Sequence, residues 1–174
     1  MDKDKIVKFK KEMQDVLTGN ILPFWIEKMV DRENGGFYGR IDGHGNLHAD
    51  AEKGGILNAR ILWTFSAAYR VLGKPEEYLE MATRAKDYIL AHFYDKEFGG
   101  IYWSLDCHGN PKDTKKQFYA IGFMIYGLSE YVRATGDKEA LDYAIRLFEC
   151  IEEHSLDVVY NGYVEAATRE WGKI

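Results

Sequence analysis

The sequence predicts an all-α fold in which helical hairpins form two concentric layers, an α/α toroid with short β-hairpins at its loop end. Two observations carry this prediction. The first is a long internal repeat: residues 35–46 return 64 residues later as residues 99–110, and a weaker third copy begins at Asn161. The second is an alternation between two kinds of helix. An internal repeat indicates one structural unit that recurs along the chain.

The repeat unit is a helix, a tight turn, a second helix and a glycine-rich loop. Gly73 and Gly136 stand 63 residues apart, and each follows a helical pattern at the position where glycine commonly ends a helix. In the loops, aromatic residues precede an Asp-x-x-Gly-Asn sequence, which is typical of a short strand and turn. We therefore expect small hairpins at residues 36–46 and 100–110.

The helices of the unit differ in their polarity. Residues 75–93 and 137–153 are amphipathic, whereas residues 56–72 and 118–131 are apolar nearly all round. The apolar positions expected to pack are Tyr78, Leu79, Ala82, Ala85, Ile89, Phe93, Leu141, Ala144, Phe148 and Ile151, and the positions expected in solvent are Glu76, Glu77, Glu80, Arg84, Lys86 and Asp87. Alternation of half-solvated and fully covered helices favours two layers over a single-layer solenoid.

Five long helices are predicted, near residues 4–28, 54–72, 75–94, 115–135 and 137–154. We treat the whole chain as one piece of one domain, because 174 residues with 46% hydrophobic content suit a single core.

The charge pattern excludes several classes of partner. The formal net charge is -5 and there is no block of Lys or Arg, so neither a nucleic-acid surface nor a polybasic membrane patch is indicated. Residues 1–14 lack the apolar stretch of a secretory signal, and Cys107 and Cys150 do not have a metal or redox spacing. We expect a cytoplasmic protein with reduced thiols.

Arg60 is the first candidate site residue, because it lies in the middle of an apolar helix where a guanidinium would be buried. A buried charge requires a carboxylate, several carbonyl groups or a polar cavity. Two interpretations stay open: a structural ion pair, or a cation that faces ligand oxygens in the lumen of the toroid.

Aromatic residues near the inner helices are the other candidates for ligand binding. Tyr119 opens one inner helix, Trp63 lies on the other, and Trp103 lies in a glycine-rich loop beside Tyr102. Each ring could stack on a sugar or pack in the core, and the sequence does not decide between these roles.

The histidines and glycines do not indicate a metal or a cofactor. His44 and His48 lie in a glycine-rich loop, and His92, His108 and His154 are scattered, so no metal site is predicted. The Gly-Gly pairs lack the spacing of a phosphate-binding loop, so no nucleotide cofactor is predicted.

Several segments, in order and spacing, resemble cellobiose 2-epimerases of the N-acylglucosamine 2-epimerase superfamily. These segments are residues 21–25, 33–39, 53–54, 59–63, 99–103 and 136–141. The resemblance implies the N-terminal portion of an (α/α)6 barrel of twelve helices and an isomerase that inverts C2 of the reducing-end glucose of cellobiose. In that family one histidine removes the C2 proton, a cis-enediolate forms, and a second histidine returns the proton.

The resemblance matches Arg60 to the family arginine that holds the sugar oxygens, and Tyr119 to a substrate-binding tyrosine. Alternatives are an N-acylglucosamine 2-epimerase or related aldose–ketose isomerase, and an inactive sugar-binding module. The family continues beyond the point matched by Ile174, and both acid/base histidines belong to that later part. We therefore expect these 174 residues alone to be inactive and to self-associate through an open flank.

Overall fold

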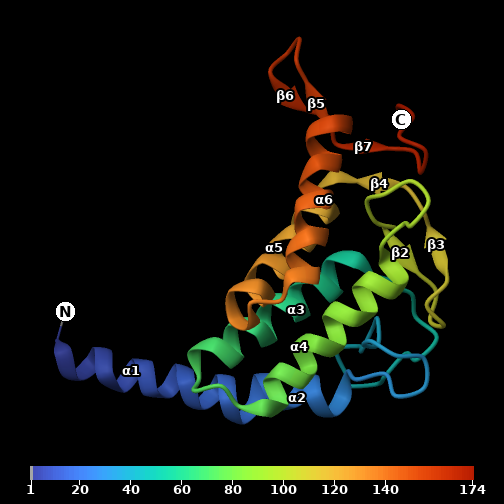
Figure 1. The fold of residues 1–174 in the computed structure, drawn as a ribbon. Helices are drawn as coiled ribbons and strands as arrows, with labels where there is room; N and C mark the ends of the chain where they lie inside the picture. The colour runs from blue at the N-terminus through green and yellow to red at the C-terminus, as the bar shows by residue number, and fades with distance from the viewer. Residues whose placement is uncertain (1) are drawn as a thin grey trace.

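The structure, a computed structural model, describes residues 2–174 and is predominantly helical, as predicted (Figure 1). The α-helices are α1 (Lys3–Val16), α2 (Leu22–Lys28), α3 (Gly55–Val71), α4 (Glu76–Tyr88), α5 (Phe118–Thr135) and α6 (Lys138–His154). Two π-helical turns, η1 (Leu17–Ile21) and η2 (Ile89–Phe93), join α1 to α2 and extend α4. The five predicted helical segments are therefore present, the first and third each containing a π-helical turn.

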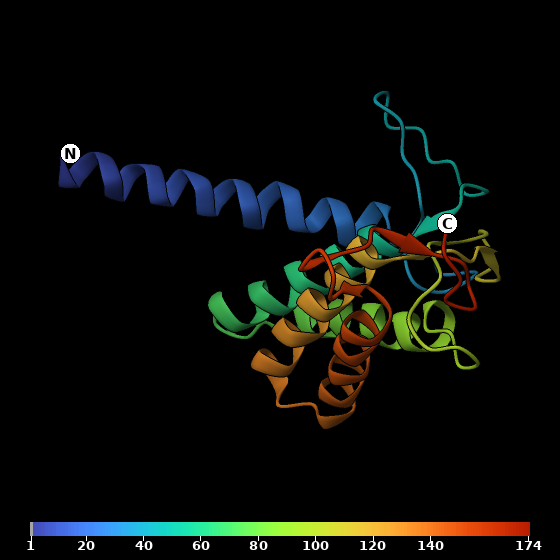
Figure 2. The same cartoon turned by 90° about the horizontal axis from the view of Figure 1, so that it is seen from above.

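Helix α1 projects from the rest of the chain, whereas α2 packs against the core through Leu22. Asp2 caps α1 by accepting a hydrogen bond from the Asp4 amide, and Pro23 occupies the first turn of α2, where proline is tolerated. No residue of α1 is buried, and Figure 2 shows this helix extending beyond the other helices.

Helices α3 and α5 form the inner layer and pack closely against each other. Gly127 of α5 makes this approach possible, because a Cβ atom there would lie 2.7 Å from the carbonyl oxygen of Ala59 in α3. Helix α4 packs beside α3 and helix α6 beside α5 (Figure 1). The predicted alternation of inner and outer helices is confirmed.

The outer helices confirm most of the predicted burial, with two corrections. On α4 the predicted apolar face is covered, but Lys86 is buried rather than solvated, because its ammonium group pairs with Asp87 and with Glu139 of α6 at 3.0 Å. On α6 the buried residues are Ala140, Ala144 and Leu147, and Ile151 packs against the core while partly buried, whereas Leu141 and Phe148 are exposed. The apolar stripe of α6 is wider than the face that α5 covers.

The strands are short, and every strand pairing in residues 2–174 is antiparallel. They are β1 (Lys53–Gly54), β2 (Ser104–Leu105), β3 (Pro111–Asp113), β4 (Lys116–Gln117), β5 (Leu156–Asp157), β6 (Gly162–Tyr163) and β7 (Ala166–Ala167). They pair as the sheet β1-β2-β3, the pair β4-β7 and the pair β5-β6.

The predicted hairpins are only partly formed. Strands β2 and β3 form the second one, but residues 36–46 form no strand and carry only isolated bridges, from Phe37 to Val30 and from Ile41 to Leu47. Helix α5 begins at Phe118 rather than near residue 115, because Lys116 and Gln117 pair with β7. In the described part of the chain, no helix is long and apolar enough to cross a membrane.

Candidate functional site

A hollow of about 780 Å³ opens between the exposed faces of the two inner helices. The lining residues of α3 have the spacing i, i+3 and i+4 of one helical face, and those of α5 have the same kind of spacing. A single face of each helix therefore forms the site. The lining residues are Arg60, Trp63 and Thr64 from α3 and Tyr119, Gly122, Phe123 and Tyr126 from α5.

Arg60 lies in this hollow and is exposed, which corrects the expectation that its guanidinium is buried. The helix is apolar around it, but no other element within residues 2–174 covers that face of α3. No ion pair forms to Arg60 in the described chain, so the closed structural pair is not what the structure shows. A second hollow, of about 410 Å³, lies on the other side of Arg60 and includes Trp25 and Ile56.

Aromatic rings from both inner helices line the hollow beside Arg60. The Trp63 ring stacks on the Tyr126 ring with centroids 5.0 Å apart and planes 10° from parallel. Phe123 touches both Tyr126 and Tyr119 edge to face, and Tyr119 is 63% exposed. Such a wall offers flat apolar faces beside a cation and a phenol hydroxyl group.

Trp103 does not join this group. It lines a separate hollow of about 540 Å³ at the start of α3, with Arg40, Glu52 and Ser104, and Lys115 lies 5.0 Å above its ring. The structure therefore brings together three of the four predicted site residues, Arg60, Trp63 and Tyr119.

Two buried ion pairs hold the N-terminal ends of the inner helices. Lys53 Nζ donates to Asp31 Oδ2 and to the Gly35 carbonyl oxygen, each at 2.7 Å. Lys116 Nζ donates to Asp95 Oδ2 at 2.8 Å and to the Gly99 carbonyl oxygen at 2.7 Å. All four charged side chains are fully buried. We call these two arrangements the lysine clamps.

The lysine clamps were missed in the sequence, although the repeat contains their signal. Asp31 and Asp95 are 64 residues apart, and Lys53 and Lys116 are 63 apart, in register with the glycine loops. Each lysine stands two residues before an inner helix begins, so each clamp fixes the helix that carries Arg60 or Tyr119.

The clamps also set the ionisation of their carboxyl groups. Burial by itself raises the pKa of Asp31, but the hydrogen bonds from the Asn34 amide and Lys53, together with the lysine charge, hold it below the ordinary 3.8. Burial acts in the same way on Asp95, and hydrogen bonds from Arg169 and Lys116 hold its pKa still further below that value. Burial lowers the pKa of Lys116.

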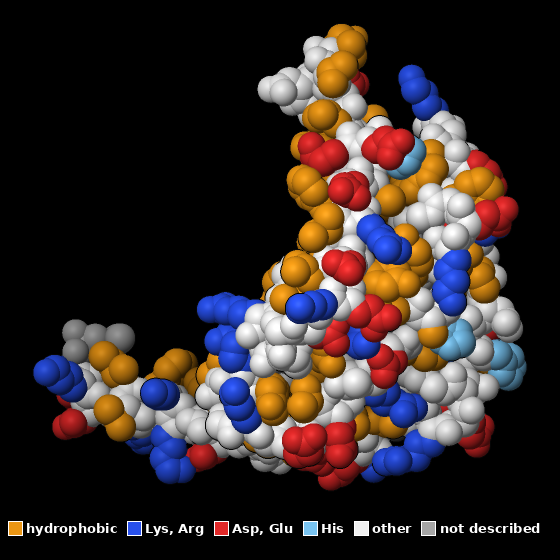
Figure 3. Space-filling model, in the orientation of Figure 1, with side chains coloured by type: hydrophobic (Ala, Val, Ile, Leu, Met, Phe, Trp, Pro, Cys, Tyr) orange, Lys and Arg blue, Asp and Glu red, His pale blue; other side chains and the backbone are white. Residues whose placement is uncertain are grey.

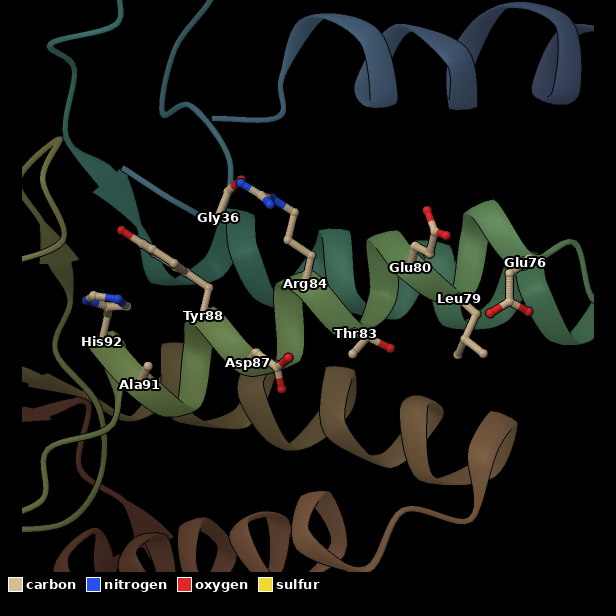
Figure 4. A pocket seen from close by; sticks show the side chains of 10 residues that line it. All are labelled: Gly36, Glu76, Leu79, Glu80, Thr83, Arg84, Asp87, Tyr88, Ala91 and His92. Carbon is tan, nitrogen blue, oxygen red and sulfur yellow. The ribbon is translucent and has the colours of Figure 1, made fainter. Parts of the chain in front are cut away.

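A further hollow, of about 670 Å³, lies on the outer side of α4 (Figure 4). There Arg84 donates one hydrogen bond to the Gly36 carbonyl oxygen at 2.9 Å and another to the Asp31 carbonyl oxygen. Its guanidinium ties the outer helix to the loop next to the first clamp, so we assign Arg84 a structural role.

None of the five histidines lines either hollow beside Arg60. His92 stacks on Tyr88 and His154 on Trp171, and His108 Nδ1 lies 3.0 Å from the Asn34 side-chain oxygen. Among residues 2–174 no cluster of three or more His, Cys, Asp or Glu side chains could hold a metal ion.

Comparison with known proteins gives a consistent result. The profile of the N-acylglucosamine 2-epimerase (GlcNAc 2-epimerase) family matches residues 36–174. A cellobiose 2-epimerase of Bacteroides fragilis is 68% identical over 165 residues, which are 95% of this chain and 42% of that protein. A cellobiose 2-epimerase of Ruminococcus albus is 49% identical over 92% of this chain and 40% of its own length.

The fold is shared with the solved structure of a cellobiose 2-epimerase. The cellobiose 2-epimerase from Bacillus thermoamylovorans B4167 superposes with a TM-score of 0.93 and 44% identity, over 96% of this chain and 42% of that one. The chain thus has the fold of one portion of an (α/α)6 barrel and spans about two fifths of the length of the relatives it matches.

Proposed function

Because this chain belongs to the N-acylglucosamine 2-epimerase family, we propose that it forms one wall of the active site of a sugar 2-epimerase. The proposed reaction inverts C2 of the reducing-end glucose of cellobiose and yields 4-O-β-D-glucosyl-D-mannose. One observation carries the proposal: Arg60 stands without an ion-pair partner in residues 2–174, beside the stacked rings of Trp63 and Tyr126.

The proposed reaction needs a positive group near the sugar oxygens. In the open-chain sugar, removal of the C2 proton leaves an enediolate whose negative charge resides on oxygen, and return of the proton to the opposite face inverts C2. No electrons are gained or lost overall. A fixed cation beside the developing oxyanion lowers the barrier, because it is already in place when the charge appears. Arg60 has the charge and the access for this role.

The remaining side chains of the hollow suit sugar binding. Trp63 and Tyr126 present flat faces for the C–H side of a sugar ring, and the Tyr119 hydroxyl group is free to hydrogen bond with a sugar hydroxyl. No histidine lines this hollow, so its share of the reaction is binding and charge stabilisation. The family resemblance assigns proton transfer to two histidines outside these residues.

A substrate panel tests the proposal on the intact gene product. Cellobiose, N-acetylglucosamine, N-acetylmannosamine and mannose are incubated separately, and the products are identified by chromatography and by loss of deuterium label from C2. Epimerisation of cellobiose alone supports the proposal. Turnover of the acylated amino sugars or of mannose to a ketose would select the alternative enzymes, and binding in calorimetry without turnover would select a sugar-binding module.

We also propose a cytoplasmic location and a single barrel domain of which residues 1–174 are one part. Both cysteines are free thiols, which suits a reducing compartment. The exposed apolar side chains of α5 and α6, among them Tyr126, Ile145 and Phe148, favour self-association of the 174-residue chain. Light scattering over a dilution series measures it, and a monomer at high concentration would contradict it.

A further inference from the structure

One seven-residue loop occurs three times in this chain, at residues 31–37, 95–101 and 157–163. In each copy the first residue is an aspartate whose Oδ1 accepts two backbone amides, those two and three residues later. The distances are 3.0 and 2.9 Å at Asp31, 3.1 and 3.3 Å at Asp95, and 2.9 and 3.0 Å at Asp157.

The backbone register is the same in all three copies. The residue before the aspartate pairs with the last residue of the loop, as Val30 with Phe37, Tyr94 with Ile101 and Leu156 with Tyr163. The residue after the loop then donates its amide to the carbonyl two residues before the aspartate, as in Tyr38 to Met29, Tyr102 to Phe93 and Val164 to Ser155. The third loop is therefore a structural copy, although the sequence shows it only weakly.

The hairpins after the loops also keep one register. Ile41 pairs with Leu47, Leu105 with Pro111 and Ala167 with Lys173. In the first two copies the chain continues from this hairpin to the clamp lysine and then directly into an inner helix.

Only the first two copies are complete. There the second carboxylate oxygen receives a lysine, 22 residues after Asp31 and 21 after Asp95, and both aspartates are fully buried. Asp157 has no ion-pair partner within residues 2–174 and is partly exposed. Its neighbours Val158, Val159 and Tyr160 are 82%, 79% and 85% exposed. Figure 3 shows hydrophobic side chains at the tip of this hairpin.

We infer that the loop at residues 157–163 is a docking site for a lysine-bearing strand, and that its Asp157 carboxylate forms a third lysine clamp. The occupant is the part of the same polypeptide that follows residue 174 and leads into the next inner helix. Charge complementarity requires a cation, and the two complete copies show that a lysine fits. The matched part makes up only 42% and 40% of two curated relatives. Those proteins are therefore long enough to contain a further strand of this kind.

Asn substitutions give a sharp test, because asparagine keeps the Oδ1 acceptor of the turn and removes only the charge and the second acceptor oxygen. The thermal midpoint is measured for Asp157→Asn in the intact gene product and in the 174-residue chain. Asp31→Asn is the positive control, since its clamp is complete in both, and Asp142→Asn on the exposed surface of α6 is the neutral control.

We expect Asp157→Asn to lower the midpoint of the intact protein by several degrees, as Asp31→Asn does, and to leave that of the 174-residue chain unchanged. The lysine of the following strand, changed to methionine, should then show a coupling with Asp157→Asn in a double-mutant cycle. The inference is wrong if Asp157→Asn is silent in the intact protein, if it is equally harmful in the 174-residue chain, or if the coding sequence supplies no lysine before the next inner helix. These measurements do not use sugar turnover, so they stand apart from the proposed enzyme function.

Discussion

Lys116 Nζ donates a 2.8 Å hydrogen bond to Asp95 Oδ2 in an ion pair from which solvent is fully excluded. The aspartate follows the outer helical segment that ends with η2, and the lysine stands three residues before Tyr119. A single buried contact thus sets where an inner helix starts and, with it, where the aromatic wall of the hollow lies. The same relationship between Lys53 and Asp31 serves the helix of Arg60.

The proposed role of Arg60 predicts that Arg60→Ala in the intact protein lowers kcat/KM for cellobiose by on the order of 10²-fold or more, because the positive group proposed to lie beside the enediolate oxygen would be lost. Arg60→Lys should keep part of the activity, since the charge remains but the two-pronged donor geometry does not. Arg146→Ala, on exposed α6, is the matched control and should retain full activity. Wild-type kinetics in Arg60→Ala would remove Arg60 from the mechanism.

Lys53→Met should destabilise the chain more than Lys116→Met. The first change leaves Asp31 buried without a cationic side chain, and breaking one partner of such a pair typically costs about 3–5 kcal/mol. After the second change Asp95 still has Arg169, which donates two hydrogen bonds to its carboxylate at 2.9 and 3.1 Å. Urea unfolding measures both variants, and the reverse order would show that Arg169 does not compensate.

Stability should fall as the pH drops below about 4. The clamps hold the pKa of Asp31 and Asp95 below the ordinary 3.8, so the unfolded chain binds more protons than the folded chain in this range. The stability that these two carboxylates contribute is present above the unfolded pKa of about 3.8. It is lost as the pH falls through their lower pKa values in the folded chain. Urea midpoints at pH 7, 4 and 3 measure the slope, which Asp95→Asn should flatten and Asp142→Asn should leave intact.

Gly127→Ala should destabilise the chain by about 1–3 kcal/mol, because the new methyl group would lie 2.7 Å from the Ala59 carbonyl oxygen and push the inner helices apart. Gly122→Ala on the same helix meets no atom within 4 Å and should stabilise by about 0.5–1 kcal/mol through helix propensity. Thermal unfolding of both variants checks the pair. Equal effects would mean that the close approach of α3 and α5 does not depend on Gly127.

The repeat and the two kinds of helix were enough to predict the helical hairpins, because spacing along the chain directly specifies which side chains share a helical face. Arg60 could be chosen from the sequence because it is a charge in the middle of an apolar helix, and Tyr119 because it opens the other inner helix. The family resemblance added the barrel and the reaction class, which periodicity alone does not contain.

Tertiary packing decided the features that depend on which element covers which face. Leu141 and Phe148 follow the apolar pattern of α6 yet are exposed, and Arg60 lies in an apolar helix yet faces an open hollow. Trp103 was chosen with the other site residues from the sequence, but it lines a different hollow.

The sequence by itself therefore determined the helices and their layers, because these follow from local spacing. The lysine clamps were decided only in the tertiary structure. A lysine and an aspartate about 21 residues apart have no local signature, and burial of both charges becomes favourable only when the folded chain supplies the partner and the carbonyl oxygens together.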